Sequence, residues 1–408
     1  MPKSDLEEET LSETQHTGPV DLLIGIAGAV NAGELQQQVQ QLQGYQGSHV
    51  VVAYPGASEV EAALPAESAF RLMPYSLPAA DRSLLPWAIA STAQRTICAM
   101  AVEMGAKVCL SLHSDLATLD TRHLELFLQA IAEKGCDLVL PVYPSRKFEG
   151  LLNHSILAPL TRALYGQRVR FPLTPDFGCS AQMAARLSDS SPHHAAGDGA
   201  LLWPSIQAAL SNYQVCQLRL DIQHATQTEG LELSTILSSL VGSAFSEMET
   251  SAAYWQRIRA SHPTATFGDM GQQWNDGEPV DTKPLIDSFL LGSRNLQEVW
   301  SLVLPPVTLL ELKKMSRVDP ASFRMPDEVW VRIVYDFALA YRLRTMNRGH
   351  LMGALAPLYL GWVASYAGEV AGLSPMGAEQ RLEQLAKAYE ENKPYLVSRW
   401  RWPDRFNP

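Results

Sequence analysis

The sequence between residues 19 and 225 alternates short apolar runs with stretches of helical pattern. The helical stretches are 33–42, 84–104, 121–133 and 151–165. Parallel strands cannot be joined by a tight turn and need a longer crossover, usually a helix. The alternation therefore predicts a largely parallel α/β sheet. The predicted strands are the apolar runs at residues 20–27, 49–54, 107–112, 137–143 and 215–222.

The pattern changes beyond residue 225, where strand-like runs stop and helical ones continue. Residues 231–260 have a helical pattern, 261–281 are polar and rich in Gly, Pro and Asp, and most of the remaining chain is helical again. We therefore predict a first domain at 19–260 and a C-terminal helical domain at 282–408. Residues 1–18 are acidic and polar, and they are predicted to form a disordered tail.

Composition argues against two classes of partner. The chain has 408 residues and a formal net charge of −11, and no basic stretch offers a surface for nucleic-acid phosphates. The uncharged run at 351–368 is short for a membrane span, so we predict a buried helix, while contact with a membrane surface stays open. The five cysteines are widely spaced and include no Cys-x-x-Cys pair, which favours reduced thiols in a cytoplasmic protein.

A candidate metal site follows the third predicted strand, where the sequence reads His113-Ser114-Asp115. His224 follows the last predicted strand. Ligands of open parallel sheets bind at the carboxyl ends of the strands, so these side chains can share one edge. Mg²⁺ and Mn²⁺ prefer oxygen ligands, and Mn²⁺ also accepts imidazole. Asp115 and His224, with two diphosphate oxygens of a substrate, would complete such a site.

Two basic residues follow the predicted strand at 137–143. Arg146 and Lys147 could bind a diphosphate or an acidic acceptor, the arginine through two parallel hydrogen bonds. Other interpretations of these residues stay open. His113 can be a packed or solvated histidine at a strand end, Asp115 a turn or helix-start aspartate, and Arg146-Lys147 a solvated loop pair.

Three segments carry a family resemblance: YPSRKFEG at 143–150, APLTRALYGQRVR at 158–170 and PLTPDFGCS at 172–180. Together they resemble a group of bacterial GT-A glycosyltransferases related to glucosyl-3-phosphoglycerate, glucosylglycerate and mannosylglycerate synthases. Those enzymes move a hexose from a nucleotide sugar to a small acidic acceptor, with retention and a divalent cation. The helical segment at 328–341 is similar to their helical part. The resemblance implies a GT-A (Rossmann-like), mostly parallel sheet domain followed by a C-terminal α-helical domain.

The same resemblance implies roles for single residues. Asp115 matches the second acid of an Asp-x-Asp metal motif, and His224 matches the histidine that completes the metal site, with His113 at the first position of the motif. Asp176 falls at the acidic position of the acceptor-site loop, and Asp198 lies near an acid that relatives carry before a helix. We therefore predict Asp176 and Asp198 to be catalytic. The residues predicted to bind the nucleotide sugar are Arg82, Ser114, Arg146 and Lys147.

The sequence also departs from the family pattern. His113 replaces the first acid of the metal motif, and Thr174-Pro175 replace two glycines of the acceptor loop, where proline removes a backbone N–H. Only Arg82 remains from a basic, glycine-containing stretch that contacts the nucleotide in relatives. Several such losses together indicate either a changed donor or lost catalysis.

Three hypotheses about function remain. The first is a cytoplasmic glycosyltransferase that uses a UDP- or GDP-hexose, Mg²⁺ or Mn²⁺ and a small, glycerate-like acidic acceptor, and that pairs as a homodimer as related enzymes do. The second is a relative that has lost catalysis and acts as a binding or regulatory protein. The third, a nucleotidyltransferase, shares the sheet and the metal, but the segment 25–31 lacks the basic residue that its glycine-rich loop would need.

Overall fold

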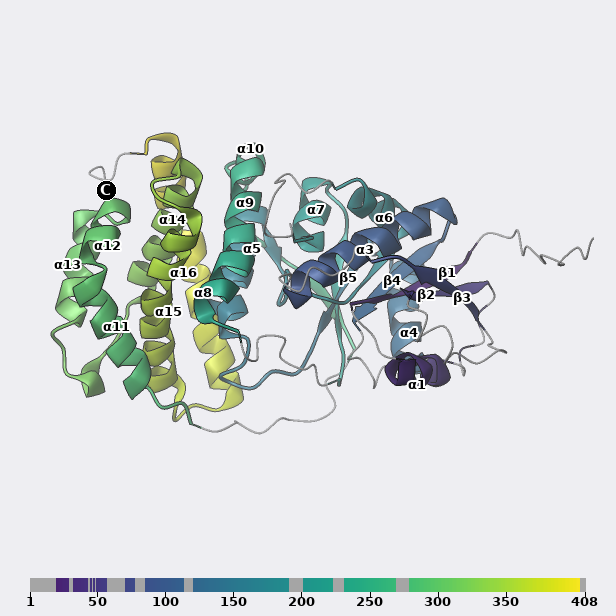
Figure 1. Cartoon of the computed structure of the whole chain (residues 1–408), viewed down its shortest axis with the longest axis horizontal. Coiled ribbons are helices and arrows are strands. Elements are labelled where there is room, and N and C mark those ends of the chain that lie inside the picture. The colour runs from purple at the N-terminus through teal and green to yellow at the C-terminus, as the bar shows by residue number, and fades with distance from the viewer. Residues whose placement is uncertain are drawn as a thin grey trace, which may run out of the picture.

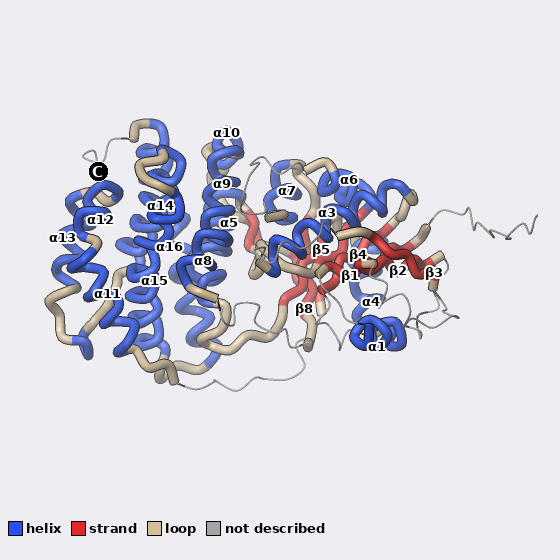
Figure 2. The backbone as a smooth tube through the Cα atoms, in the orientation of Figure 1, coloured by secondary structure: helices blue, strands red, loops and turns tan. Residues whose placement is uncertain are grey.

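In the computed structural model the chain has a sheet-containing half and a helical half, which lie side by side along its longest axis (Figure 1). Among the described residues, the strands belong to the sheet-containing half, and helices account for nearly all of the helical half (Figure 2). The predicted fold class, a mostly parallel α/β sheet with a C-terminal helical part, is confirmed. The predicted tail at 1–18 lies outside the described residues. The structure describes residues 20–28, 32–42, 45, 47, 49–56, 70–77, 85–113, 120–190, 201–222, 231–268 and 279–403.

The main sheet has eight strands in the order β10-β8-β5-β7-β4-β1-β2-β3. All neighbouring pairs are parallel except those of β7, which runs antiparallel to both β4 and β5. A separate parallel pair is formed by β6 (Gln167–Arg168) and β9 (His262–Pro263). The strands of the main sheet are β1 (Leu22–Ala27), β2 (Val50–Pro55), β3 (Arg71–Tyr75), β4 (Val108–His113), β5 (Leu138–Val142), β7 (Phe177–Ser180), β8 (Val215–Arg219) and β10 (Ala265–Phe267).

The strands are apolar on both faces because helices cover both faces of the sheet. In β1, Leu22, Ile24 and Ile26 pack into one hydrophobic cluster, whereas Leu23 and Ala27 pack into the other, as alternation of side chains along a strand requires. The first cluster is closed by α1 (Ala32–Leu42), α4 (Thr121–Leu128) and the π-helical turn η1 (Gln129–Glu133). The second is closed by α3 (Pro86–Glu103), α6 (Ala181–Ser188) and α7 (Pro204–Leu210).

The helical half has its own core, which includes the buried Trp255, Trp330, Trp362 and Tyr389. Its first elements, at residues 153–165, lie in the sequence between strands β5 and β7. They are attached to the later helices at Ser155, whose carbonyl accepts hydrogen bonds from Trp330 Nε1 (3.2 Å) and from Tyr389 Oη (2.7 Å). Residues 233–255 also pack here, although the predicted boundary placed them with the sheet. The elements of this half are η2 (Asn153–Leu157), α5 (Ala158–Tyr165), α8 (Leu233–Ile236), η3 (Leu237–Val241), α9 (Gly242–Thr250), α10 (Ala252–Trp255), α11 (Lys283–Asn295), α12 (Gln297–Val303), α13 (Pro306–Met315), η4 (Pro320–Ser322), α14 (Asp327–Leu343), α15 (Arg348–Val370) and α16 (Pro375–Arg401).

The uncharged run at 351–368 lies within α15 and is buried in the helical core, as predicted. Leu351, Leu355 and Leu358 are completely enclosed there. In the described part of the chain, no helix has the length and the apolar character needed to cross a membrane.

Strand β7 lies where the sequence predicted only an acceptor-site loop. Its four residues are too few for a periodic signal, and Gly178 interrupts them. A Cβ at Gly178 would come within 2.8 Å of Leu110 and of Phe127, so the glycine lets the strand fit closely under these side chains. The edge strands β3 and β10 and the short pair β6 and β9 were missed as well. β3 is only partly buried and contains Arg71 and Pro74, and the other three have only two or three residues.

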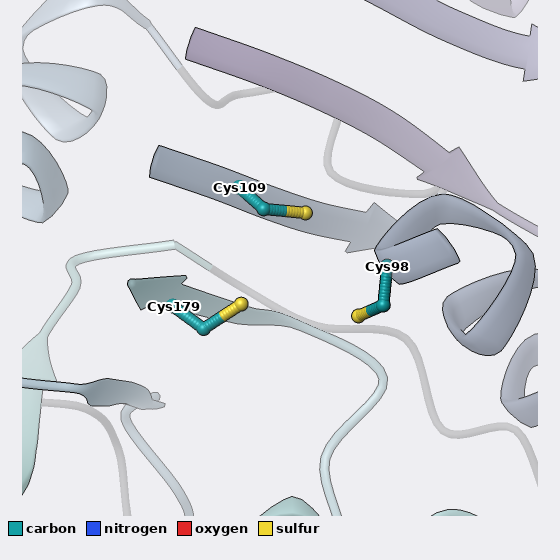
Figure 3. Close-up of side chains that lie close together, drawn as sticks. All are labelled: Cys98, Cys109 and Cys179. Carbon is teal, nitrogen blue, oxygen red and sulfur yellow. The ribbon is translucent and has the colours of Figure 1, made fainter. Parts of the chain in front are cut away.

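The cysteines fall into a bonded pair and a buried cluster. Cys136, just before β5, forms a disulfide with Cys216 of β8, their Cα atoms being 6.1 Å apart. This pairing contradicts the expectation that all five cysteines are reduced. The two residues are 80 positions apart, and only the pairing of β5 with β8 brings them together. The other three, Cys98, Cys109 and Cys179, are free and buried, with sulfur atoms within 4.8 Å of one another (Figure 3).

Candidate functional site

The carboxyl ends of β1 and β4 meet at Gly28 and His113. The two strands are paired along their length, with Ala27 opposite His113. Gly28 follows directly and has a φ of +118°, which L side chains rarely adopt. A Cβ at this position would lie 3.1 Å from Nε2 of His113. Glycine therefore allows both the turn after β1 and the close approach of the histidine ring.

Asp176 joins three strand ends at this edge. Its side chain is completely buried. One carboxylate oxygen accepts the backbone N–H of His113 (2.5 Å), and the other accepts the hydroxyl of Tyr143, which follows β5 (2.6 Å). Asp176 itself precedes β7, and its own N–H donates to Oγ1 of Thr174 (3.2 Å). One carboxylate thus fixes the end of β4, the end of β5 and the loop before β7 relative to one another.

The loop at 172–176 is also held from α3. The side-chain amide of Gln94 is buried, and its Nε2 donates to the carbonyls of Thr174 (3.3 Å) and Pro175 (2.8 Å). A cavity of about 150 Å³ lies between this loop and α3, with Trp87 in its wall. The carbonyls of the loop are therefore bound within the protein, and Pro175 offers no N–H.

Arg146 and Lys147 have different environments. The backbone N–H of Arg146 donates to the carboxylate of Glu149 (3.0 Å), and its half-exposed guanidinium lies 3.6 Å from the same carboxylate. Lys147 is largely buried, and its carbonyl accepts the hydroxyl of Tyr366 from α15 (3.2 Å). The loop after β5 is thereby attached to the helical half. The predicted contact of both side chains with a nucleotide sugar stays a prediction.

Four of the predicted site residues are described, and the structure brings two of them, His113 and Asp176, into direct contact. Arg146 and Lys147 lie in the loop that follows Tyr143, the other partner of Asp176. The remaining predicted residues lie outside the described residues: Arg82, Ser114, Asp115, Asp198 and His224.

The described side chains do not by themselves make a site for Mg²⁺ or Mn²⁺. Beside His113, the carboxylate of Asp176 already accepts a hydrogen bond on each oxygen. Within the described ranges, the side chains that gather three metal-binding atoms are the cysteines of Figure 3, whose soft sulfur atoms differ from the oxygen atoms that these cations prefer. The oxygen ligands required by the metal prediction would come from Asp115 and from the substrate.

Two further hollows lie beside the strand ends. One of about 690 Å³ lies on the α4 face, where His123 Nε2 is 2.9 Å from Oδ1 of Asp221. The hydrogen bond from His123 lowers the pKa of Asp221. The other, of about 420 Å³, lies between α5, strand β8 and α16. We call the second hollow the basic groove, because its walls include Arg162, Arg168, Arg170 and Arg219.

Sequence reasoning missed the basic groove. The signal was the alternation of Arg168 and Arg170 in an extended segment, which places both side chains on one side. Glu379 and Glu383 of α16 complete the walls from more than 200 residues away. No local pattern links α16 to this segment.

Comparison with known proteins gives likeness to solved structures alone. No family model matches the chain, and no curated protein does. One similar structure is glucosyl-3-phosphoglycerate synthase from Mycobacterium tuberculosis in complex with Mn²⁺, UDP-glucose and phosphoglyceric acid, at 15% identity and a TM-score of 0.41, covering 58% of this chain and 80% of that chain. The same enzyme with Mg²⁺ and UDP gives 16% identity and a TM-score of 0.40, covering 56% and 79%. A likeness of this extent does not assign an activity to the chain.

Proposed function

We propose that the protein is a glycosyltransferase that moves a hexose from a UDP- or GDP-hexose to a small acidic, glycerate-like acceptor with retention, aided by Mg²⁺ or Mn²⁺. The observation that supports it best is the hydrogen bond between Asp176 and the backbone of His113. Asp176 belongs to the segment that resembles an acceptor loop, and His113 opens the segment that resembles a metal motif. The carboxylate of Asp176 therefore connects the segment that resembles an acceptor loop with the segment that resembles a metal motif.

The proposed roles follow from these positions. Asp115 and His224, with His113 beside them, would hold the cation, which supplies positive charge for the departing diphosphate when it is bound. The remaining donor contacts are assigned to Arg82, Ser114, Arg146 and Lys147.

The two proposed catalytic acids differ in what supports them. Asp176 is enclosed, and both of its oxygens are hydrogen-bonded to the protein, so we assign it a positioning role at the acceptor loop. Asp198, shortly before α7, remains the second proposed catalytic acid. A retaining transfer driven mainly by electrostatic stabilisation does not need a strong nucleophile from the protein.

A second candidate function is that of a binding or regulatory protein without transferase activity. It is supported by the acceptor loop, where Gln94 occupies the carbonyls of Thr174 and Pro175. It is also supported by the histidine at position 113, where an oxygen ligand would suit a hard cation better.

The first test is isothermal titration of the full chain with UDP-glucose, GDP-glucose and GDP-mannose, each with and without Mn²⁺. We expect one donor to bind only with the cation, and binding to be lost in Asp115→Ala and in His224→Ala. Asp287→Ala, at an exposed position of α11, is the matched control and should bind as the parent does. Unchanged binding in the two site variants would refute the metal assignment. If no donor binds to a folded protein, the second candidate function is favoured.

A further inference from the structure

The basic groove is a hollow between two parts of the chain that are far apart in sequence. Helix α5 and strand β8 form two of its walls, and α16 of the helical half forms the third. Its volume of about 420 Å³ is within the range of small-molecule sites. The walls carry four arginines, although the whole chain has a net charge of −11.

Two of the four arginines are paired with carboxylates of α16. The guanidinium of Arg162 lies 2.6 Å from Glu383 and 2.8 Å from Glu390. Arg170 forms an ion pair with Glu379 through Nη1. These ion pairs attach α5 and the segment after it to α16, and the carboxylates balance the positive charges of both arginines.

The other two arginines have no such partner. The Nε of Arg168 donates to the hydroxyl of Ser261 (2.8 Å), and no carboxylate of the described residues lies within 4.0 Å of its guanidinium. Arg219, at the end of β8, is exposed and likewise forms no ion pair within the described part of the chain. The groove therefore keeps two guanidinium groups that form no ion pair with a described carboxylate, although Arg168 also interacts electrostatically with Glu390.

Two buried N–H groups of the groove also lack an acceptor. They are Nε of Arg170 and Nε2 of His154, a side chain of which 8% is exposed. Burial and the nearby Arg170 lower the pKa of His154 to about 3, so its ring is neutral at neutral pH. Nδ1 of this ring faces the amide nitrogen of Asn153 at 3.4 Å and accepts from it, which assigns the ring proton to Nε2. An unmet buried donor costs about 1–3 kcal/mol.

We propose that the basic groove binds a small oxyanion, the phosphate or carboxylate group of a metabolite. The unpaired guanidinium groups of Arg168 and Arg219 attract the charge, and the planar fork of an arginine matches both phosphate and carboxylate. Nε2 of His154 and Nε of Arg170 are enclosed behind this surface, so the contacts with the oxyanion are assigned to the two exposed arginines. This site needs neither a sugar donor nor a divalent cation, so it does not depend on the proposed transferase activity.

Arg170 also connects this groove with the loop after β5. Its Nη2 donates to the hydroxyl of Ser145 (2.9 Å), and its backbone N–H donates to Oε1 of Gln217 (2.6 Å). Ser145 precedes Arg146 in the chain, so the groove adjoins the loop that carries residues proposed to contact the nucleotide sugar. The groove is therefore next to the proposed transfer site and distinct from the contacts around Asp176.

The test uses the full chain and two probes, inorganic phosphate and D-glycerate, each compared with chloride at equal ionic strength. Equilibrium dialysis gives affinity and stoichiometry, and the shift of the melting temperature gives an independent readout. We expect saturable binding of one equivalent. Binding of phosphate alone identifies a phosphoryl ligand, binding of glycerate alone identifies a carboxylate ligand, and binding of both identifies a general oxyanion site. All three results support the proposal.

The variants place the binding in the groove. Arg168→Gln and Arg219→Gln remove charges without an ion-pair partner, so they leave the fold intact and should weaken binding about tenfold each, as expected for the loss of one charged contact of about 1.4 kcal/mol. Arg294→Gln, on the exposed side of α11, is the matched control and should bind as the parent does. Two results would overturn the proposal: neither probe binding more strongly than chloride, or both groove variants binding with the parent affinity.

Discussion

Replacing Asp176 with alanine tests whether one carboxylate holds the strand ends together. The substitution removes the carboxylate that accepts from the N–H of His113 and from the hydroxyl of Tyr143. Hydrogen bonds to a charged group contribute about 1.5–3 kcal/mol each. Release of a buried carboxylate offsets part of this loss, because the charge no longer has to be desolvated. We expect Asp176→Ala to lower the free energy of unfolding by about 3 kcal/mol.

Tyr143→Phe separates the two hydrogen bonds. Alone it removes the bond to one oxygen and should cost about 1–3 kcal/mol. In the Asp176→Ala background its cost should nearly vanish, because the hydroxyl has already lost its acceptor. The two substitutions should therefore couple by about 1–3 kcal/mol. Asp176→Asn keeps an acceptor for the N–H of His113 and should cost less than alanine.

Urea unfolding of the two single variants and the double variant measures the coupling, with Asp287→Ala as an exposed control expected to change stability by less than about 0.5 kcal/mol. Hydrogen exchange at the amide of His113 is the local readout, and it should quicken in Asp176→Ala. If the costs of the two single substitutions simply add, or if the amide of His113 stays protected, the network described around Asp176 is not the one that holds these strand ends.

Three further predictions concern stability and redox state. Burial raises the pKa of Glu247 to about 7, so between pH 4.5 and 7 the folded state keeps a proton that the unfolded state releases. The free energy of unfolding should therefore fall as pH rises through this range, by at most about 1.4 kcal/mol per pH unit. Urea unfolding at several pH values should show that Glu247→Gln removes this part of the slope. Arg399→Met removes the guanidinium whose Nε lies 2.8 Å from the buried carboxylate of Asp336, to which the hydroxyl of Tyr395 still donates, and should cost about 3–5 kcal/mol. Lys314→Met, at an exposed ion pair, should cost less than about 1 kcal/mol. A thiol reagent should titrate three groups in the unfolded chain before reduction and five after it, and five before reduction would exclude the Cys136–Cys216 disulfide.

Most of the fold could be predicted from the sequence because its periodicities are strong. The apolar runs at β1, β2, β4, β5 and β8 are five or six residues long and are buried on both faces, so they differ clearly from the helices between them. Pro86, Pro204 and Pro375 fall in the first turns of helices, where the missing N–H costs nothing. Strand β7 could not be predicted, because Gly178 and three neighbours carry no periodic signal.

The candidate site could be predicted only in part. Asp115, Arg146 and Lys147 could be proposed as site residues because each follows a predicted strand, and the carboxyl ends of parallel strands meet at one side of the sheet. Asp176 was singled out by resemblance, and its burial and its bond to His113 depend on where β7 inserts. The basic groove depends on the packing of α16 against α5, and helix packing over such separations leaves no local mark in the sequence.

The place of β7 in the sheet sets an order for assembly. β4 and β5 follow each other in the chain, yet β7 lies between them and bonds to both. A growing chain that ends before Phe177 therefore has β3, β2, β1 and β4 as one piece and β5 without a partner, since β8 comes later still. Closing these contacts requires loops of many residues, which slows folding. Until then β4 presents an apolar, unpaired edge, so the interval between synthesis of β4 and arrival of β7 is the period in which this chain is most exposed to aggregation.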